Sequence, residues 1–517
     1  MDNKFLNALL DYYHISLNDY EELTAKYDLS SFSLGHEFKD IAKARDIALN
    51  AIKNKKRIII YGDYDADGIM GTSILVKMFK MLNYEVSYYI PSRYIDGYGL
   101  NVTNATKCIG KFDLMITVDN GIVANEAIDI LKNAGIEVIV IDHHTVQLPL
   151  PNADAIVHPE VSEYGEVATS GAYSAFMFSK AVLGYYDKYL ATMAAISVIS
   201  DMMPLKSYNR KLLKAVFNDY VVDEFLPISL LAEHKKLDER VIGSLVAPKI
   251  NALGRMKEDK SINLIVKYFV SDDKDFILTY SDFITATNNE RKELGKEVTN
   301  DILTNLNDEA LVNKLDIKEG LIGLIANGIM NKIHKPAIVF TRDKEGNLKG
   351  SARSLEGFNI VEAFKKLEKY MLNYGGHALA GGCSIKESDY ENFKKDFIEL
   401  VNSSTIIKKE KETIDISIND IDKDHYDIYN SFAPFGEGWP APLLALKGIK
   451  VEALQYSKDT KHILTRIGYN SKIVGFNISK ESLFNYQYID TIGTLDTSSY
   501  KGTISYEFHI NECNKRN

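Results

Sequence analysis

Residues 57–68 read RIIIYGDYDADG, an apolar run that passes after a single glycine into a cluster of aspartates. The run has about the length of one strand and is apolar at successive positions, which is typical of a strand buried on both faces. This stretch therefore predicts a buried parallel strand that carries acidic side chains at its carboxyl end.

Three further β-branched runs follow at intervals long enough for a helix. They are EVSYYIP at 85–91, LMITV at 114–118 and EVIVI at 137–141. Strands that are apolar on both faces and alternate with helices form a parallel sheet covered by helices. We therefore expect an α/β domain over residues 57–215, preceded by a mostly helical lead over residues 1–56.

Residues 216–306 are expected to form a helical connector. Between Phe276 and Ile302 the apolar residues recur at steps near three and four, which predicts one long helix. A second strand–helix region, and thus a second α/β domain, is expected over residues 307–407. Its predicted elements are strands at 320–326 and 335–341 and a helix at 359–372.

Residues 408–517 have an all-β pattern. They begin with KKEKE at 408–412, a charged break that predicts a linker. About five short strands in about 100 residues predict a small barrel or sandwich. The predicted strands are 413–418, 461–467, 472–478, 488–495 and 503–510.

The composition is that of a globular protein. The chain has 517 residues, of which 45% are hydrophobic and 26% charged, and these values exclude a disordered chain and a collagen. A net charge of −10 argues against a generally basic nucleic-acid coat but leaves room for a local basic groove. Three cysteines lie far apart, and no run of about 20 apolar residues could span a bilayer, so we expect a cytoplasmic protein.

Acidic and histidine side chains follow the other strands as well. Asp119 follows the run at 114–118, and Asp142, His143 and His144 follow the run at 137–141. Because the carboxyl ends of parallel strands share one edge of the sheet, these side chains are expected to converge there. Asp201, which ends the apolar segment AAISVIS, is a further acid for the same place.

Aspartates and histidines without cysteine match the ligands of Mn²⁺ or Mg²⁺ better than those of structural zinc. Several carboxylates stay charged together only when cations neutralise them. Two ions about 3.5–4 Å apart, bridged by one carboxylate, would cleave a phosphoester. A single aspartate after a strand is more often a turn or helix-capping residue, and DYDADG imitates a calcium loop. However, the twelfth position counted from Asp63 is Ile74 and not the expected glutamate, and the joint pattern favours a metal centre.

Four of these segments, in order, resemble the motifs of the DHH phosphoesterase superfamily: GDYDADG (62–68), VDNG (118–121), DHH (142–144) and SDMMPL (200–205). Nearly the whole chain resembles one branch, the RecJ family of bacterial single-strand-specific 5′→3′ exonucleases. The segments that carry this resemblance are PSRYIDGYGL (91–100), PKINALGRM (248–256), TNNERK (287–292), KGSARS (349–354), GGHALAGG (375–382) and APFGEGWPAPLLAL (433–446).

The resemblance implies a fold and a set of metal ligands. The fold is a parallel-sheet DHH catalytic domain, a helical connector, an α/β DHH-associated domain and an OB-fold β-barrel. Two Mn²⁺ or Mg²⁺ ions would be held by Asp65, Asp67, Asp119, His143 and Asp201. Asp119 would bridge them, His144 would contact the scissile phosphate, and Asp63 and Asp142 would support the ligands. Tyr61 stands where many relatives carry a histidine, and its effect on the first ion is left open.

The resemblance also implies residues that bind DNA and the 5′-phosphate: Arg93, Tyr98, Arg255, Arg291, Ser351, Arg353, Gly376 and His377. The last four of these would cradle the terminal phosphate, close to the metals. Tyr98 either stacks on a base or packs in the core. The barrel would bind single-stranded DNA, whereas Trp439 is expected to be a turn residue packed at a domain junction.

The implied function is a monomeric, metal-dependent exonuclease that releases mononucleotides from single-stranded DNA in recombination and repair. A helicase and a single-strand binding protein are the implied partners. A phosphodiesterase or pyrophosphatase for small substrates would leave the barrel without a purpose. A non-catalytic replication scaffold would not need repelling carboxylates, and a single-strand binding protein would not need the first 400 or so residues. The physiological metal, the use of RNA and the processivity are left open.

Overall fold

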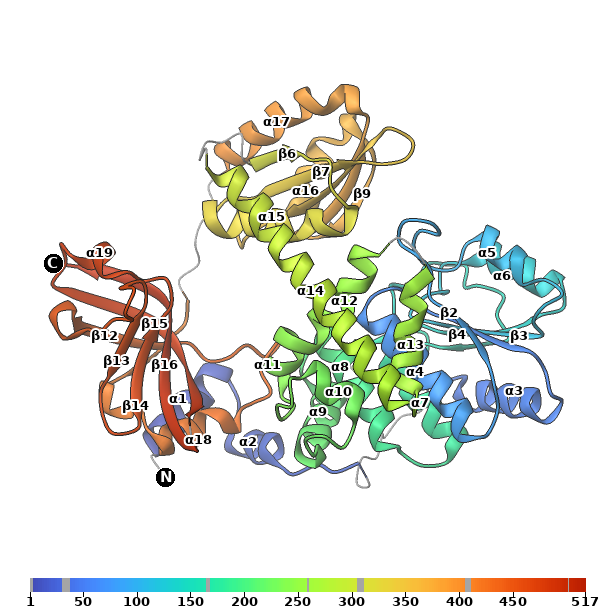
Figure 1. Ribbon diagram of the computed structural model, residues 1–517, viewed down its shortest axis with the longest axis horizontal. Coiled ribbons are helices and arrows are strands. Elements are labelled where there is room, and N and C mark those ends of the chain that lie inside the picture. Colours follow the sequence, from blue (N-terminus) through green and yellow to red (C-terminus); the bar gives the residue numbers. More distant parts are fainter. Residues whose placement is uncertain are drawn as a thin grey trace.

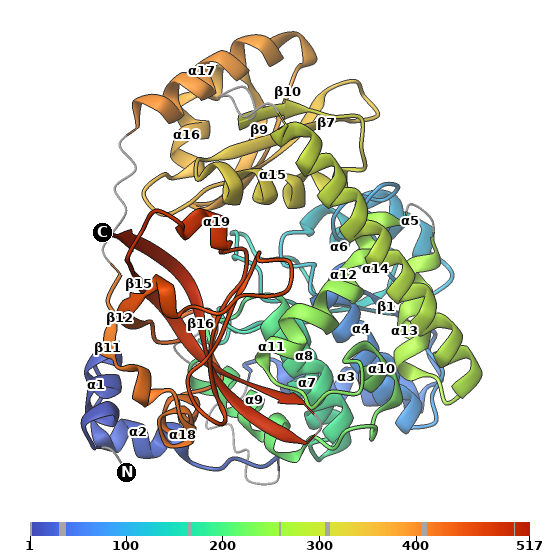
Figure 2. The same cartoon turned by 60° about the vertical axis from the view of Figure 1, so that its left-hand side comes forward.

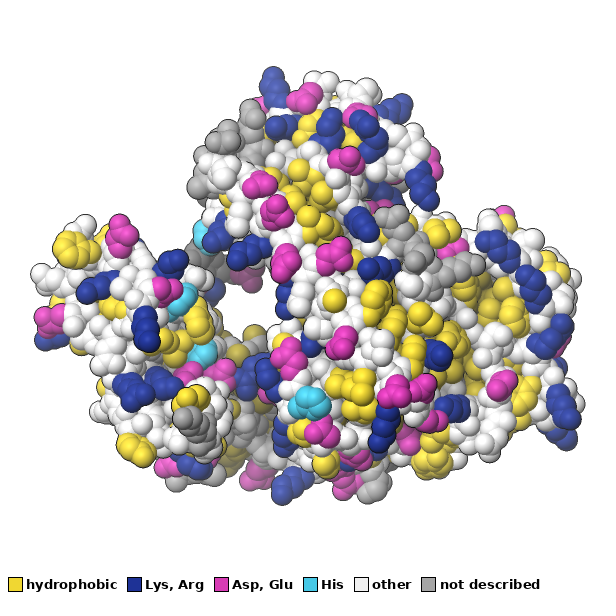
Figure 3. Space-filling view, viewed as in Figure 1, with side chains coloured by type: hydrophobic (Ala, Val, Ile, Leu, Met, Phe, Trp, Pro, Cys, Tyr) yellow, Lys and Arg dark blue, Asp and Glu magenta, His cyan; other side chains and the backbone are white. Residues whose placement is uncertain are grey.

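The computed structural model describes residues 3–29, 38–163, 168–257, 260–304, 311–404, 411–500 and 502–517. Its domains lie around an opening (Figures 1 and 3). In Figure 1 the first α/β domain and the connector lie on the right, the second α/β domain at the top and the barrel on the left. The boundaries predicted at 306/307 and 407/408 lie outside the described residues, as does most of the predicted linker at 408–412.

The first sheet is parallel throughout and has the strand order β2-β1-β3-β4-β5. Its strands are β1 (Ile58–Tyr61), β2 (Ser87–Tyr89), β3 (Leu114–Val118), β4 (Glu137–Ile141) and β5 (Ala155–Val157). The parallel sheet with four predicted strands is confirmed. The fifth strand was not predicted, and it is only three residues long.

Helices cover both faces of this sheet. Ile58 and Ile60 belong to the core under α3, α4 and α7, whereas Ile59 and Tyr61 belong to the core under α5 and α6. This explains why the run at 57–61 is apolar at successive positions. The helices are α3 (Ile41–Lys53), α4 (Ala66–Met81), α5 (Val102–Cys108), α6 (Asn125–Asn133), α7 (Gly171–Leu183) and α8 (Lys188–Ser200).

The connector is helical, as predicted. Its elements are α9 (Ser207–Asp219), α10 (Leu226–Leu231), α11 (Glu239–Val241), a π-helical segment (Ile242–Val246), α12 (Ala247–Met256), a 3₁₀ segment (Lys260–Asn263), α13 (Leu264–Val270) and α14 (Lys274–Leu303). The predicted long helix is α14, which has 30 residues. Among the described residues, no helix is both long and apolar enough to cross a membrane.

The second sheet has the order β6-β7-β8-β10-β9. Its strands are β6 (Val312–Lys314), β7 (Ala337–Arg342), β8 (Leu348–Arg353), β9 (Met371–His377) and β10 (Ala380–Ile385), and its helices are α15 (Glu319–Ile333), α16 (Ile360–Lys366) and α17 (Tyr390–Ser403). The strand predicted at 335–341 is confirmed as β7, and the helix predicted at 359–372 is correct only for its first half.

The strand predicted at 320–326 is wrong, because these residues lie in α15. The sequence GLIGLIA is almost wholly apolar, and periodicity does not distinguish a short buried strand from a buried helix. Here the helix is buried because Leu321 and Ile325 pack with Ala337 and Val339 of β7 on one face of the sheet. α16 and α17 cover the other face.

Over residues 411–500 and 502–517 the C-terminal domain has six strands in the order β11-β12-β15-β16-β14-β13. They are β11 (Ile414–Ile416), β12 (Leu444–Lys450), β13 (Ile463–Arg466), β14 (Ser471–Gly475), β15 (Tyr488–Tyr500) and β16 (Thr503–Arg516), with α18 (Lys423–Ser431) and α19 (Lys480–Leu483) between them. A bridge from Tyr456, beyond β12, to Ile463 on β13 curls the sheet back on itself. β12 was not predicted, whereas the other five strands were.

The N-terminal lead is divided between two domains. α3 packs on the first sheet, but α1 (Asn3–Tyr13) and α2 (Leu17–Thr24) lie beside α18 of the C-terminal domain (Figure 2). The Tyr13 ring stacks on Trp439 with a centroid distance of 4.2 Å. The guanidinium of Arg210 also lies over the Trp439 ring. It donates hydrogen bonds to the carbonyls of residues 432–434. Trp439 is therefore packed at a domain junction, as expected.

Candidate metal centre and strand-binding residues

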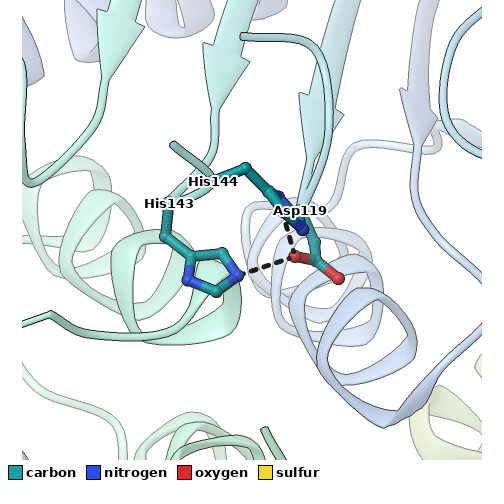
Figure 4. Close-up of side chains that lie close together, drawn as sticks. All are labelled: Asp119, His143 and His144. Atoms are coloured by element: carbon teal, nitrogen blue, oxygen red, sulfur yellow. Dashed lines mark hydrogen bonds and ion pairs between the residues drawn. The ribbon is translucent and has the colours of Figure 1, made fainter. Parts of the chain in front are cut away.

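The acidic and histidine side chains converge at the carboxyl edge of the first sheet. Figure 4 shows Asp119, after β3, with His143 and His144, after β4. Three overlapping groups have possible ligand atoms within 4.8 Å of one another. They are Asp63 with Asp65 and Asp119, Asp67 with His143 and Asp201, and Asp119 with His143 and His144. We call Asp63, Asp65, Asp67, Asp119, Asp201 and His143 together the acidic cluster.

His143 lies at the centre of the acidic cluster. Its Nε2 atom is 3.1 Å from Asp119 Oδ1, 3.4 Å from Asp67 Oδ2 and 3.5 Å from Asp201 Oδ2. Asp119 has φ = +61°, in the left-handed region that aspartate and asparagine tolerate better than most residues. The turn after β3 therefore points the Asp119 carboxylate into the cluster.

The carboxylates of the cluster destabilise one another. Burial and then the charge of Asp67 raise the pKa of Asp119 well above its usual range, and the same causes raise the pKa of Asp201 to about 8. Asp63 shows the same upward shift of its pKa, from burial and from Asp65. Its Oδ1 atom is buried without a hydrogen-bond partner. Buried oxygens of this kind fit divalent cations, which replace the missing partners and remove the repulsion.

Asp67 is held rigidly by main-chain and hydroxyl donors. Its carboxylate accepts hydrogen bonds from the amides of Gly171 (2.8 Å) and Ala172 (2.7 Å) at the N-terminus of α7. Ser197 Oγ donates a third, at 2.5 Å. Sequence reasoning missed Ser197, although it precedes Asp201 by four residues and so lies on the same side of α8.

His144 is tied to Asp142. Its Nδ1 atom lies 2.7 Å from Asp142 Oδ1, and the other oxygen of Asp142 accepts a hydrogen bond from the amide of Ile122. Burial disfavours the imidazolium, but the bond to Asp142 outweighs it and raises the pKa of His144 to about 9. In the absence of metal ions, Asp142 therefore favours the imidazolium form of His144. Its Nε2 atom lies 2.8 Å from the hydroxyl of Tyr98, whose side chain is half exposed and not part of the core.

Two residues of the 61–67 segment occupy places that the sequence left undecided. Asp63 has an oxygen within 4.8 Å of possible ligand atoms of Asp65 and Asp119. It is therefore a candidate metal ligand itself, and not only a residue that supports the ligands. The Tyr61 side chain packs on the face of the sheet that α5 and α6 cover, away from the acidic cluster. Its hydroxyl donates to the Gly99 carbonyl and accepts from Asn104 Nδ2 at 2.9 Å.

Four arginines, which we call the arginine group, come together from different elements: Arg93, Arg255, Arg291 and Arg353. Burial, followed by the charges of the other three, lowers the pKa of Arg255 to about 10, and Asp65 acts in the opposite direction. Arg93 lies over the Tyr64 ring at 4.3 Å, and its Nε atom is buried without a partner. The arginine group therefore adjoins the acidic cluster. Within the described part of the chain, none of its four arginines forms an ion pair with a carboxylate.

α12 brings the arginine group to the acidic cluster. Asn251 Oδ1 accepts a hydrogen bond from the amide of Ala66, at the start of α4. One turn later, the Arg255 carbonyl accepts a hydrogen bond of 2.5 Å from the Tyr94 hydroxyl. The same hydroxyl accepts from the Gly320 amide at 3.3 Å, so these contacts also join α15 to the catalytic domain.

The residues predicted to hold the 5′-phosphate, Ser351, Arg353, Gly376 and His377, are called here the end pocket. They lie on β8 and β9, the two strands on either side of β10, because Ala380 of β10 pairs with Arg353 on one side and with His377 on the other. Arg353 donates to Ser351 Oγ at 3.0 Å. A Cβ atom at Gly323 would lie 2.8 Å from Arg353 Nη2, so this glycine leaves the room that the guanidinium occupies. Gly376, with φ = +137°, adopts a backbone conformation that favours glycine.

Comparisons with known proteins agree with this architecture. Residues 57–200 match the DHH family N-terminal domain, residues 307–403 the DHHA1 domain and residues 414–512 the RecJ OB domain. The single-stranded-DNA-specific exonuclease RecJ of Salmonella typhimurium is 30% identical over 405 residues, which cover 71% of this chain and 70% of that protein. The chain belongs to the RecJ family.

Two further RecJ proteins mark the extent of the likeness. The Bacillus subtilis exonuclease RecJ is 29% identical over 93% of this chain, but the chain spans only 62% of that relative's length. The crystal structure of Thermus thermophilus RecJ in complex with Mn²⁺ superposes with a TM-score of 0.82 and 26% identity, over 99% of this chain and 76% of that one. The likeness to this RecJ therefore extends to the arrangement of all the domains.

Proposed function

We propose that this protein is a metal-dependent exonuclease that degrades single-stranded DNA from its 5′ end and releases mononucleotides. The observation that carries the proposal is the buried, self-repelling acidic cluster placed directly beside the arginine group. The relatives named as single-stranded-DNA-specific exonucleases support the choice of substrate. Recombination and repair are the processes in which such an activity is expected.

The acidic cluster fits two divalent ions, Mn²⁺ or Mg²⁺. Asp63, Asp65 and Asp119 would hold one ion, and Asp67, His143 and Asp201, with Asp119 as the bridge, would hold the other. When bound, such ions activate water and stabilise charge on a phosphate. The sharing of Asp119 between overlapping groups of possible ligands supports this pairing.

The chain's own residues would orient the substrate. Asp142 holds the His144 ring through Nδ1, and Nε2, which contacts the Tyr98 hydroxyl, would donate a hydrogen bond to an oxygen of the scissile phosphate when the strand is bound. The half-exposed ring of Tyr98 lies beside His144 and would stack on the base next to the scissile bond.

The end pocket and the arginine group would fix the 5′-terminal phosphate. Arginine binds phosphate through two parallel N–H donors, and the exposed residues of β9 lie across β10 from Arg353. Anchoring of the terminal phosphate here would place the first linkage over the acidic cluster. Duplex DNA would be excluded sterically, because the space between the two α/β domains would admit one strand.

The C-terminal domain would hold the strand further from its 5′ end. Tyr469, Phe476 and Phe484 are exposed at 98%, 61% and 81%, which is unusual for aromatic side chains. Sequence-tolerant stacking contributes about 1–3 kcal/mol per base. A monomer that acts in the cytosol beside a helicase and a single-strand binding protein is the setting we infer from the family, and the three free cysteines are consistent with a reducing compartment.

The test uses the full chain, Mn²⁺ and three substrates: a 3′-labelled, 5′-phosphorylated single strand, its blunt duplex and a dinucleotide. We expect a ladder that shortens from the 5′ end of the single strand only. Cleavage of the dinucleotide alone would move the protein to the small-substrate branch of the superfamily. Binding of the strand without any cleavage would contradict the proposal and favour a scaffold.

A further inference from the structure

A second basic surface lies outside the end pocket, in the groove between α14 and α15. The groove is a cavity of about 540 Å³ whose polar lining comes chiefly from Arg291, Lys292, Lys296 and Asn300 on α14 and from Asn331 and Lys332 on α15. We call it the basic groove. Nothing in the proposed function uses its lysines.

No described carboxylate forms an ion pair with a lysine of the basic groove, although the charges of Glu233 and Lys292 attract each other over a longer distance. Among the described residues, Lys292, Lys296 and Lys332 form no ion pair and are exposed, and Arg291 donates only to the side chain of Asn288. The neighbouring glutamates of α14, at positions 290, 293 and 297, do not line the cavity. A row of unpaired cations in a hollow concentrates anions there.

The shape of the groove favours a polymer backbone over a base. Small residues form its floor where the two helices approach closely: a Cβ atom at Gly328 would lie 3.0 Å from Thr299. Leu324 is the only large apolar side chain among its lining residues, and none of these residues is aromatic. Without an aromatic platform the groove would bind phosphates and not stack bases.

The basic groove is continuous with the arginine group. Arg291 belongs to both, and from it the lining of α14 extends to Asn300. Nine residues of helix at 1.5 Å each span roughly 13 Å, the length of about four phosphates of a stacked strand. At the α15 side, Gly323 adjoins Arg353 and Gly328 adjoins the groove floor, so both helices lead away from the end pocket.

We propose that the basic groove binds the phosphate backbone of the same single strand whose end occupies the arginine group. This proposal rests on the proposed function for the identity of the strand. It adds a sequence-independent contact over about four nucleotides that is distinct from the end pocket and from the C-terminal domain. Its contribution depends on salt, because each bound phosphate releases counterions.

The test is a binding measurement that needs no catalysis. The variant Lys292→Gln/Lys296→Gln/Lys332→Gln is compared with a control, Lys39→Gln/Lys43→Gln/Lys53→Gln, in which exposed lysines at and just before α3 are changed. Both variants lower the net charge from −10 to −13, because three positive charges are removed. Fluorescence anisotropy with 3′-labelled, 5′-phosphorylated dT20 and dT3 is followed across a salt series in EDTA.

We expect the groove variant to bind dT20 about tenfold more weakly, with the slope of log K against log salt reduced by about 2, since each contact contributes about 0.7. Its binding of dT3 and both affinities of the control should stay within about twofold of wild type. The groove proposal would be overturned by an unchanged affinity for dT20, by an equal loss of affinity for dT3 or by an equal loss of affinity in the control variant. Failure of the wild type to cleave DNA would refute the proposed function. The binding measurement would still show whether the basic groove binds a single strand.

Discussion

The acidic cluster and the arginine group have opposite charges, but each holds side chains of like charge close together in a buried environment. Burial and mutual repulsion raise the pKa of Asp119 and Asp201, and burial and mutual repulsion lower the pKa of Arg255. Each of the two is destabilised by itself and is completed by a ligand of the opposite charge. Cations on one side and a phosphate chain on the other satisfy both.

The two clusters differ in how they are built. The acidic cluster comes from one domain, with Asp67 fixed by three hydrogen bonds and Asp65 capping α4. The arginine group is assembled from a loop of the catalytic domain, two connector helices and β8 of the second domain. We therefore expect the metal centre to be preformed, whereas the phosphate site depends on how the domains sit together.

The largest effect is expected from removal of the shared carboxylate. Asp119→Asn keeps a side chain that tolerates the left-handed backbone but removes the bridging charge. Mn²⁺-dependent cleavage of single-stranded DNA should fall by more than about 10³-fold. Cleavage is measured with the 3′-labelled strand, and Asp129→Asn on the exposed side of α6 is the charge-matched control.

The metal-free Asp119→Asn protein should be at least as stable as the wild type, because a repelling charge is gone. A clear loss of its thermal midpoint would mean that Asp119 has a structural role. Appreciable Mn²⁺-dependent cleavage by a well-folded variant would remove Asp119 from the metal centre.

The next largest effect tests the arginine group. Arg353→Ala should weaken binding of a 5′-phosphorylated single strand by about 10- to 100-fold, since a hydrogen bond to a charged group contributes about 1.5–3 kcal/mol. A strand with a 5′-hydroxyl should lose much less. Anisotropy with the two strands measures this difference, and equal losses would contradict the assignment of Arg353 to the end pocket.

The stability of the metal-free protein should depend on pH in a defined direction. The pKa of Asp201 is raised from 3.8 to about 8 and that of His144 from 6.5 to about 9, so the folded state binds more protons than the unfolded state between about pH 4 and 9. Stability should therefore fall as the pH rises through this window. We expect the midpoint to drop by about 3 °C or more between pH 5.5 and 8.5.

Mn²⁺ should weaken this pH dependence, because bound cations replace the protons on the carboxylates. Differential scanning fluorimetry with EDTA and with Mn²⁺ makes the comparison, and Asp201→Asn should flatten the EDTA curve. A midpoint that rises with pH in EDTA would show that repulsion within the acidic cluster does not control the pH dependence of stability.

The smallest effect is expected at Tyr61. Its hydroxyl points to Gly99 and Asn104 and away from the acids, so Tyr61→Phe should leave cleavage within about twofold of wild type. The lost hydrogen bonds should lower the free energy of unfolding by about 1 kcal/mol. Urea unfolding and the exonuclease assay check the two parts, and a tenfold loss of activity without a change in stability would assign Tyr61 a part in metal binding.

The sequence by itself determined the parallel sheet and the edge at which Asp65, Asp119 and His143 meet. An apolar run without periodicity, followed by acids, has one interpretation once helices separate the runs, because parallel strands end at one edge. The same reasoning failed for residues 320–326, where an apolar run alone does not distinguish a strand from the buried helix α15. Sequence reasoning also could not show that Asp63 lies within metal-ligand distance of Asp65 and Asp119, or that the Tyr61 side chain points away from them.

Only the tertiary structure decided the contacts between distant segments. Arg93, Arg255 and Arg353 are far apart in the chain, and their mutual effect on pKa arises from domain packing. In the same way, the packing of Tyr13 on Trp439 and the basic groove between α14 and α15 depend on how helices meet. The physical reason is that periodicity reports local burial, whereas the direction and partner of a charged side chain are set by the elements that pack against it.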